Sequence, residues 1–526
     1  MRLARMTAAA MVLAIAPVHA ASGGPLVKTA SGTVEGVAAA SGSSVQIFRG
    51  IPFARPPIGQ NRWREPQPVQ RWSGVRSADQ FGPRCMQKRL WDDMFFRSPA
   101  ASEDCLYLNV WTPADLHARS AAKLPVLVYI YGGGFLAGDA SEPRYDGAAM
   151  ASQGIVVVTL NYRLGIFGFL AHPELTAESR HHASGNYGLM DQAAALAWVR
   201  KNIARFGGNP RRITIGGESA GSMSVSGLVT SPLSRGSIAG AIGESGSLML
   251  SAKVPTRAEG EAEGTAFAAS QNALSLAALR AVPAETLLAA QSADGRRFGP
   301  VIDGYFLPEQ PAVTYASGKA AKVPLLVGSN SQEAAASGVL NDALPTLANY
   351  RAALTRLYAE KADAVFALYP ATRDADVVRV ATDLASDRFL GAATWRWFDA
   401  HRRTGAPTFY YYYQHVRPRP TAYTATGAAP FGAVHSAEIE YALGNLDANP
   451  AYAWTDEDRR LSTVMTGYFA NFIKTANPNG GGLPAWAAAS IDDKVIQRQI
   501  IDVETRAAPF PGQARYLAME TLAPPR

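Results

Sequence analysis

The stretch ITIGGESAGS, residues 213–222, decides the fold. In it a β-branched run stops abruptly in small residues, and Ser219 lies among them beside the carboxylate of Glu218. Gly217 and Gly221 flank the serine at the spacing of a corner where a strand turns sharply into a helix and raises the serine hydroxyl above the sheet. Bulky neighbours would collide with the adjacent strand or helix there. The pattern therefore predicts that Ser219 is a nucleophile.

The flanking sequence supports this interpretation more strongly than the pentapeptide does. The chain has 47 glycines, so a plain small-residue turn is the alternative explanation of the motif. A β-branched run precedes the corner, however, and SMSVSGLVTS (222–231) can continue as a helix, which is the context that the motif requires. A rival serine, Ser245 in GESGS (243–247), lacks a glycine at the second position after it. We expect Ser245 to be a buried hydrogen-bonding support near the site.

Strands and helices alternate along the chain. Nearly continuous apolar runs at 124–131 and 154–163 predict buried central strands. Residues 190–206 have the apolar spacing of a helix, with Gly207 and Gly208 as its stop. Further short β-rich segments follow at 213–217, 239–243, 323–329 and 408–416. This alternation predicts an α/β fold, with a mostly parallel central sheet flanked by helices in one large domain.

The first twenty residues predict a secretory signal. Arg2 and Arg5 precede an apolar stretch at 8–16, and the segment ends in the small-x-small pattern 18–20. We therefore expect residues 1–20 to be a signal peptide and residues 21–526 to be the exported catalytic domain, periplasmic or secreted. An uncleaved anchor is the alternative, but the apolar run is short for a bilayer. No later segment is long and uncharged enough to predict a membrane span in the mature protein.

Charge and cysteine content restrict the classes of partner and compartment. The formal net charge is +7, but lysines and arginines are scattered without a dense basic block, so we expect no nucleic-acid partner. Cys85 and Cys105 are the only two cysteines. An oxidising compartment favours a disulfide between them, and two separate buried thiols are the alternative.

A serine hydroxyl needs a base to become nucleophilic at neutral pH. Among the eight histidines, His435 follows a glycine-containing loop and precedes an apolar helical segment, where this arrangement needs its base. His172 is the fallback, although its position before Pro173 indicates a structural role. The remaining histidines lie in the leader, polar connections, a basic helical stretch or a strand pattern: His19, His117, His181, His182, His401 and His415.

The acid that orients the base should lie between the serine and the histidine in chain order. Glu333 follows a predicted strand directly, at the end where catalytic groups of parallel sheets gather. Asp303 is the competing carboxylate, and its position before Gly304 indicates a turn residue. We therefore predict Glu333 as the acid.

The last requirement is a group of donors for the negative charge that develops on a carbonyl oxygen. YIYGGGF (129–135) leaves a strand as three consecutive glycines, so backbone N–H groups can approach a substrate without obstruction. We predict an oxyanion hole made by the N–H groups of Gly133, Gly134 and Ala220, with a plain glycine turn as the alternative.

Several long motifs carry a family resemblance. They are FRGIPFARPP (48–57), SEDCLYLNVWTP (102–113), LNYRLGIFGFL (160–170), GNYGLMDQAAALAWVRKNIARFGGNP (185–210) and FGGNPRRITIGGESAG (206–221). With the residues above, they make the chain similar to the type-B carboxylesterases, which include cholinesterases and bacterial para-nitrobenzyl esterases. The similarity runs from about residue 32 to about residue 486, and it implies the α/β-hydrolase fold.

The resemblance implies roles for residues that match the family pattern. It carries the nucleophile onto Ser219, the acid onto Glu333 and the base onto His435, and it places Glu218 and Ser245 in supporting positions. It also implies the Cys85–Cys105 disulfide and the ion pairs Arg62–Glu103 and Arg163–Asp191. One departure is that relatives usually have Asp-Glu-Gly around the acid, where this chain has Gln332-Glu333-Ala334.

The implied reaction is hydrolysis of a small-molecule carboxylic ester through an acyl-enzyme, with no metal or organic cofactor. The same triad acting on an amide, thioester or lactone is one alternative. A non-catalytic interaction module is another, although such modules usually lack part of the triad. The sequence leaves the particular ester, the residues that line its pockets and the oligomeric state open.

Overall fold

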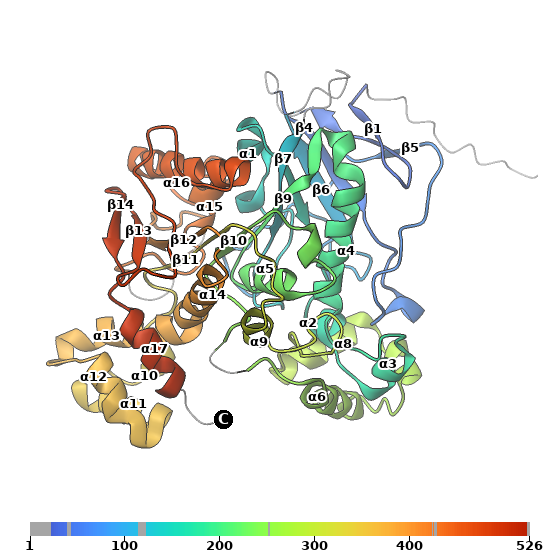
Figure 1. Cartoon of the computed structure of the whole chain (residues 1–526). Coiled ribbons are helices and arrows are strands. Elements are labelled where there is room, and N and C mark those ends of the chain that lie inside the picture. The colour runs from blue at the N-terminus through green and yellow to red at the C-terminus, as the bar shows by residue number, and fades with distance from the viewer. Residues whose placement is uncertain are drawn as a thin grey trace, which may run out of the picture.

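The computed structural model describes residues 23–38, 44–113, 123–250, 253–422, 424 and 429–522. The predicted signal peptide, residues 1–20, lies outside these residues. Figure 1 shows a large twisted sheet that runs across the molecule with helices packed around it. No helix in these ranges combines the length and apolar character needed to cross a membrane.

The central sheet is 11-stranded in the described part of the chain. Neighbouring strands are parallel from β8 through β7, β9, β10, β11 and β12 to β13, whereas the outer pairs at both edges are antiparallel. In spatial order the strands are β14 (Arg506–Pro509), β13 (Gln497–Ile501), β12 (Thr408–Tyr413), β11 (Leu325–Asn330), β10 (Gly240–Glu244), β9 (Gly208–Glu218), β7 (Leu124–Ile130), β8 (Val156–Leu160), β6 (Tyr107–Thr112), β4 (Gln46–Pro52) and β3 (Val37–Ala38). The predicted α/β-hydrolase fold with a mostly parallel sheet is confirmed.

The central strands are apolar along their whole length because both faces of the sheet are covered. Every residue of β8 is buried, and so is all of β7 after its first residue. Side chains alternate between the two faces of a strand, so continuous burial requires packing on both faces. The main helices that pack on the sheet are α1 (Ala148–Ser152), α4 (Tyr187–Asn202), α5 (Ala220–Thr230), α14 (Ala392–Arg402) and α16 (Asp456–Thr475). Outside them, α9 (Pro311–Ala316) packs on α5 and α14, and α15 (Ile439–Leu443) packs on α16.

The helix predicted at 190–206 begins three residues earlier and changes form near its end. It is α4 over Tyr187–Asn202, followed by a 3₁₀ turn over Ile203–Phe206. Gly207 then ends it in the left-handed conformation, with φ of 81°. Glycine adopts that conformation without a steric penalty, which is why the predicted stop functions as one.

Two smaller parts surround the sheet. Near the N-terminus, β1 (Leu26–Lys28), β2 (Thr33–Glu35) and β5 (Val75–Ser77) form a separate three-stranded sheet. Beyond β11 the chain makes a helical excursion, seen at the lower left of Figure 1, which has its own hydrophobic cluster with α17 (Gln513–Leu522). Its helices are α10 (Ser337–Leu340), α11 (Leu347–Tyr358), α12 (Ala362–Leu368) and α13 (Asp374–Ser386). That residues 21–526 form one domain stays a prediction.

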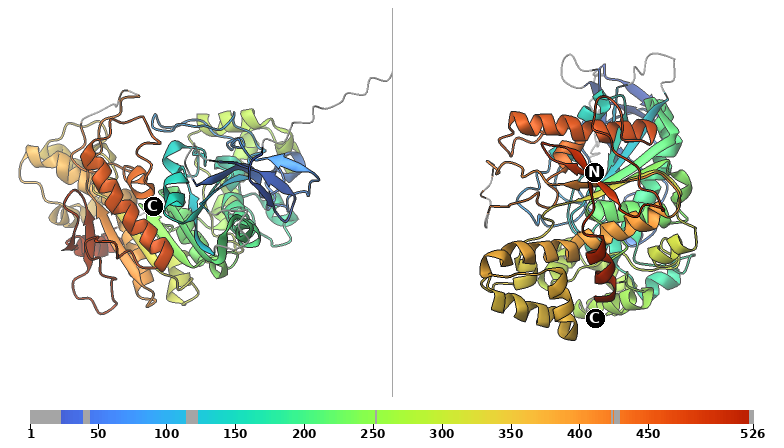
Figure 2. Two further views of the ribbon diagram at one scale, coloured as in Figure 1. Left: turned by 90° about the horizontal axis from the view of Figure 1, so that it is seen from above. Right: turned by 60° about the vertical axis from the view of Figure 1, so that its left-hand side comes forward.

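Figure 2 places the same excursion and α17 at one end of the molecule, away from the small N-terminal sheet. Between α13 and α14 the helix is interrupted by a π-helical turn at Asp387–Gly391. Turns of this kind are rare and are found frequently at functional sites. The excursion therefore rejoins the sheet through an irregular element.

Covalent and ionic links fasten the loops around the sheet. Cys85 and Cys105 form a disulfide, which closes the loop that contains Met94. Arg62 makes two hydrogen bonds of 2.6 Å to Glu103, and Arg163 makes two of 2.8 Å to Asp191. Both ion pairs implied by the family resemblance are therefore present.

Loss of the buried ion pair should be costly, because the Arg163 and Asp191 side chains are only 3% and 0% exposed. We expect Asp191→Asn to leave the guanidinium without its anion and to lower the free energy of unfolding by about 3–5 kcal/mol. Asp363→Asn breaks the solvent-exposed Arg351–Asp363 pair and should cost less than about 1 kcal/mol. Urea titrations of both variants test this, and equal losses would show that burial does not determine the cost.

Candidate active site

The sharp corner predicted at Ser219 is present. Strand β9 ends at Glu218, helix α5 begins at Ala220, and Ser219 joins them with a φ of 57°. A side chain on Gly217 or Gly221 would place its Cβ 2.5 Å or 2.0 Å from the carbonyl oxygen of Ile130 at the end of β7. Only glycine allows this close approach, so the spacing of the two glycines follows from the packing of β9 and α5 against β7.

The structure brings Ser219, His435 and Glu333 into one hydrogen-bonded chain. Nε2 of His435 lies 2.9 Å from Oγ of Ser219, and Nδ1 of the same ring lies 2.7 Å from Oε2 of Glu333. The three residues follow β9, β12 and β11, so the carboxyl ends of three neighbouring parallel strands supply them. An imidazole in this position can take a proton from the serine while the carboxylate fixes the ring.

Two donors fix the second carboxylate oxygen of Glu333, the one that does not face His435. Oε1 accepts a 2.6 Å hydrogen bond from the hydroxyl of Ser245 and another of 2.6 Å from the backbone N–H of Asn330. Ser245 is fully buried. The rival serine of the sequence therefore donates to the predicted acid, and its supporting role in catalysis stays a prediction.

Gln332, part of the departure from the family pattern, connects the loop of the acid to the loop of the base. Its Oε1 accepts backbone N–H groups from Phe431 at 3.1 Å and Gly432 at 3.2 Å, and its own N–H donates to the carbonyl of Ala433 at 2.8 Å. These contacts fix the segment that leads into His435. Sequence reasoning missed this role, because the contacts join positions about a hundred residues apart.

Further buried carboxyl groups lie near His435 or beside the residues that contact it. Oε1 of Glu218 lies 3.2 Å from Nε2 of His435, and the side chain of Glu438 receives a 2.5 Å hydrogen bond from Asn330. Glu244, whose Oε1 accepts from the hydroxyl of Tyr129 at 2.9 Å, completes the group. Sequence reasoning missed Glu244 and Glu438, although Glu244 precedes Ser245 as Glu218 precedes Ser219.

Burial and charge act in opposite directions on these groups. Burial raises the pKa of Glu218 to about 7 and that of Glu244 to about 8, and it raises the pKa of Glu438 as well. For His435, burial by itself lowers the pKa, but the negative charge of Glu218 and the hydrogen bond to Glu333 outweigh it and raise the pKa to about 10. The surroundings therefore strongly favour the imidazolium, the form that a base reaches during nucleophilic attack.

The glycine loop after β7 lies against the serine corner. An added Cβ on Gly132 would lie 3.0 Å from Cβ of Ser219, so the two segments are in contact. The carbonyl of Gly133 accepts the N–H groups of Leu136 and Ala137, which turns the loop back on itself. The N–H groups of Gly133 and Gly134 make no hydrogen bond within the described residues, and that of Ala220 opens α5, where helical donors are unpaired.

The competing candidates have structural roles elsewhere. Oδ1 of Asp303 accepts the N–H groups of Tyr305 at 3.0 Å and Leu307 at 2.8 Å, so this carboxylate stabilises a turn as expected. The ring of His172 accepts the N–H of Glu174 at 3.2 Å and caps helix α3 (Pro173–Glu178). Neither residue has a hydrogen bond to the group around Ser219. Within the described ranges, no cluster of three or more metal-ligating side chains is found.

An apolar cavity of about 380 Å³ adjoins the serine corner. Its wall includes Phe135, next to the glycine loop, and Met223, on the first turn of α5. Phe169, Leu248, Leu250 and Phe298 extend the apolar lining, and charged side chains of α6 (Arg257–Ser270) and a facing loop, Glu259, Glu263 and Arg297, complete it. The cavity is of the size and character that bind the apolar part of a small organic molecule.

Comparison with known proteins finds carboxylesterases similar to this chain over most of its length. The model of the carboxylesterase family matches residues 23–509. Fumonisin B1 esterase of Sphingopyxis macrogoltabida is 38% identical over 482 residues, which cover 87% of this chain and 83% of the relative. Pyrethroid hydrolase Ces2e of Rattus norvegicus is 36% identical over 499 residues, covering 88% and 84%.

Solved structures of esterases are also similar to this chain. A structure of PNB esterase superposes with a TM-score of 0.78 at 33% identity and covers 95% of this chain and 99% of its own. The carboxylesterase EST55 of Geobacillus stearothermophilus gives a TM-score of 0.76 at 31% identity, covering 94% and 99%. The resemblance found in the motifs is thus confirmed over nearly the whole length: this chain belongs to the carboxylesterase family and is a carboxylic ester hydrolase.

Proposed function

We propose that this hydrolase works through a Ser219–His435–Glu333 triad. The observation that carries the proposal is the unbroken relay from Oγ of Ser219 through both ring nitrogens of His435 to Glu333, at 2.9 Å and 2.7 Å. His435 takes the proton of Ser219 as its oxygen attacks the ester carbonyl, and Glu333 orients the ring and stabilises its positive charge. The same proton then goes to the departing alcohol.

In the second half of the reaction, water repeats these steps on the acyl-enzyme. The negative charge that forms on the carbonyl oxygen in both halves is received by the N–H groups of Gly133, Gly134 and Ala220. Two observations support this choice of donors. The N–H groups of the two glycines make no hydrogen bond within the described residues, and Ala220 lies at the start of α5. Loss of one such donor typically raises the barrier by about 3 kcal/mol.

The substrate that we propose is a small carboxylic ester with an apolar part. The apolar cavity beside Met223 and Phe135 supports this class. Amides, thioesters and lactones would use the same attack on a carbonyl, so comparison of matched ester and amide substrates separates these possibilities. We also propose that residues 1–20 direct export, a proposal supported by their charge and apolar pattern and by the Cys85–Cys105 disulfide.

Removal of the nucleophile tests the triad directly. Ser219→Ala should lower kcat for short-chain para-nitrophenyl esters by at least about 10³-fold, because no other oxygen can form the acyl-enzyme. His435→Gln should lose a similar amount. Ser317→Ala changes an exposed serine at the end of α9 and should hydrolyse the esters normally. Circular dichroism checks that all three variants are folded, and normal turnover by folded Ser219→Ala would refute the assignment.

The negative charge of Glu218 should set the pH range of the enzyme. An anion 3.2 Å from Nε2 stabilises protonated His435 and raises its pKa, whereas catalysis requires the neutral ring. Glu218→Gln should therefore lower that pKa and move the acidic limb of the kcat/KM profile to lower pH by about one unit or more.

The measurement is kcat/KM of the wild type and of Glu218→Gln from about pH 5 to about pH 11, so that the range extends past the pKa of about 10 for His435. Glu263→Gln removes a carboxylate from the outer lining of the apolar cavity and should leave the limb in place. A limb that does not move in Glu218→Gln would mean that Glu218 is uncharged while His435 titrates.

A further inference from the structure

Exposed basic side chains gather at the edge of the central sheet where its parallel strands begin. This edge lies opposite the one that carries Ser219. Six lysines and arginines come from the start of β7 and of β9, from the end of α4 with its 3₁₀ turn, and from β1. We call them the basic face, and all six are exposed: Lys28, Lys123, Lys201, Arg205, Arg211 and Arg212.

Hydrogen bonds hold the segments of the basic face together. The N–H of Leu124 donates to the carbonyl of Gly207 at 3.0 Å, which brings the start of β7 beside the turn after α4. The N–H of Ala30, just after β1, donates to Oδ1 of Asn202 at 2.8 Å, and β1 packs on the same turn. The guanidinium of Arg212 donates to a carbonyl in the last turn of α16. Cations that are scattered along the sequence therefore lie on one surface, and α16 and β1 are both seen in the upper part of Figure 1.

Carboxylates are absent from the segments that build this surface. No aspartate or glutamate occurs in four segments that form or border it, residues 25–34, 123–138, 192–217 and 459–491. Within the described part of the chain, none of the six cations forms an ion pair. Glu35 of β2 is a carboxylate at the rim, and it accepts the N–H of Gly24 at 3.1 Å. The negative ends of the α4 and α16 dipoles offset about one charge together, so the basic face is strongly positive.

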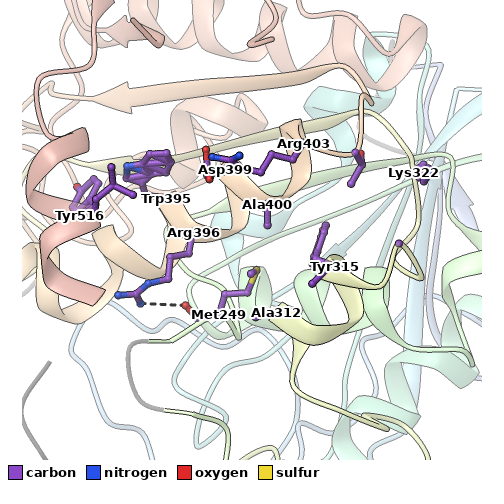
Figure 3. A pocket seen from close by; sticks show the side chains of 14 residues that line it. Met249, Ala312, Tyr315, Lys322, Trp395, Arg396, Asp399, Ala400, Arg403 and Tyr516 are labelled. Atoms are coloured by element: carbon purple, nitrogen blue, oxygen red, sulfur yellow. Dashed lines mark hydrogen bonds and ion pairs between the residues drawn. The ribbon is translucent and has the colours of Figure 1, made fainter. Parts of the chain in front are cut away.

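Farther along the same edge the positive charge is neutralised, which marks where the basic face ends. Lys319 pairs with Glu309 at 3.2 Å, and Arg403 pairs with Asp399 at 2.8 Å. Figure 3 shows Arg403 and Asp399 on α14 and the residue after it, beside a cavity of about 570 Å³ between α9, α14 and α17. These two cations belong to ordinary ion pairs, in contrast to those around β7 and β9.

Exposed leucines lie among the cations. Leu26 and Lys28 project from the same side of β1, because Val27 between them is buried, and Leu26 is 55% exposed. Leu233 is 38% exposed in the connection between α5 and β10, to which the side chain of Arg200 donates at 2.7 Å. A leucine can enter the headgroup layer of a bilayer while a neighbouring cation contacts lipid phosphate.

The surface lacks the rings with which proteins bind single-stranded nucleic acids. Trp198 and Phe206 lie in the same segment as the cations of α4 and its turn, but both are buried. Buried rings cannot stack on bases. Exposed leucines also gain nothing from a polyanion in water, since its phosphates stay hydrated.

From this arrangement we infer that the basic face docks the protein on an anionic lipid surface, through the phosphates of the headgroups. Arg212 lies seven residues before Ser219 along β9. Because a strand rises about 3.3 Å per residue, roughly 20 Å separates the docking surface from the serine corner. The carboxyl edge of the sheet then faces away from the lipid and stays open to esters in solution. The inference does not depend on which residues form the triad.

Sedimentation with large vesicles tests the inference on the complete exported protein. Vesicles of phosphatidylcholine with about 30% phosphatidylglycerol should bind it at least about tenfold more tightly than phosphatidylcholine alone at about 0.1 M salt, and about 0.5 M salt should remove the difference. Equal binding to the two kinds of vesicle at the lower salt concentration, or binding to neither, would overturn the inference.

Two triple variants with the same change in net charge locate the binding. Each cation near an anionic surface contributes about fivefold in affinity, so the variant of the basic face should bind about 100-fold more weakly. It combines Lys201→Gln, Arg205→Gln and Arg211→Gln. The control should stay within about threefold of the wild type, because its exposed cations lie elsewhere. It combines Arg180→Gln, Arg379→Gln and Arg460→Gln.

Both triple variants should hydrolyse para-nitrophenyl acetate in solution as the wild type does, which shows that they are folded. Residues 1–20 are the same in both, so any contribution of that segment to binding is common to them. An equal loss of binding in the two variants would show that only total charge matters and would refute the inference.

Leu26→Asn separates a bilayer from a soluble polyanion. It should weaken vesicle binding about fivefold and leave binding to duplex DNA unchanged. Leu274→Asn changes a leucine that is 88% exposed just before α7 (Leu276–Ala281) and should alter neither. Tighter binding to DNA than to the anionic vesicles at equal phosphate concentration would assign the basic face to a polyanion and overturn the inference.

Discussion

The close approach of Gly217 and Gly221 to the carbonyl oxygen of Ile130 is the constraint on which the active site depends. Strand β7 ends at Ile130, so the point that requires these glycines is also the point from which the glycine loop leaves the sheet. An added Cβ on Gly132 would lie 2.6 Å from the carbonyl of Glu218, which brings the loop equally close to the serine corner. Packing of two strand ends therefore sets the distance between the proposed nucleophile and the proposed oxyanion donors.

The second constraint is electrostatic. Glu218, Glu244 and Glu438 are buried close to the proposed triad, where full ionisation of all three would be costly, and their raised pKa values reflect that cost. Formation of an imidazolium at His435 offsets part of it. The fold thus stores a preference for the charged state that appears during proton transfer, before any substrate binds. The same stabilisation of protonated His435 disfavours the neutral ring, which must accept the proton at the start of the reaction. The negative charge of the carboxyl groups therefore has opposite effects on the two protonation states that the reaction uses.

Much of the fold and the centre of the site could be predicted because their signals are local. Buried parallel strands are continuous apolar runs, and the corner at Ser219 has a spacing imposed by sterics. Glu333 was predicted as the acid from its position after a strand, although its neighbours depart from the family pattern, and the structure places its carboxylate 2.7 Å from His435. The roles of Gln332 and Glu438 could not be found in this way, because their partners lie in segments that only the folded chain brings together. The helical excursion after β11 and the cavity beside α14 depend on the same long-range packing.

The position of that excursion explains how acid and base can be separated by 102 residues and still meet at 2.7 Å. The acid loop and the base loop are joined directly by the backbone bond from Gln332 to Ala433 and by the side chain of Asn330, which donates to the carbonyl of Val434 at 2.8 Å. The helices between them have their own hydrophobic cluster and do not supply these bonds. One contact does join them to the acid loop, because the hydroxyl of Ser386 at the end of α13 accepts the N–H of Ala334 at 3.1 Å. Their return path also passes the site, since Phe389 of the π-helical turn lies edge-on to His435 at 5.5 Å. A segment that packs mainly in its own hydrophobic cluster and still contacts the proposed catalytic histidine is where differences in substrate preference can arise.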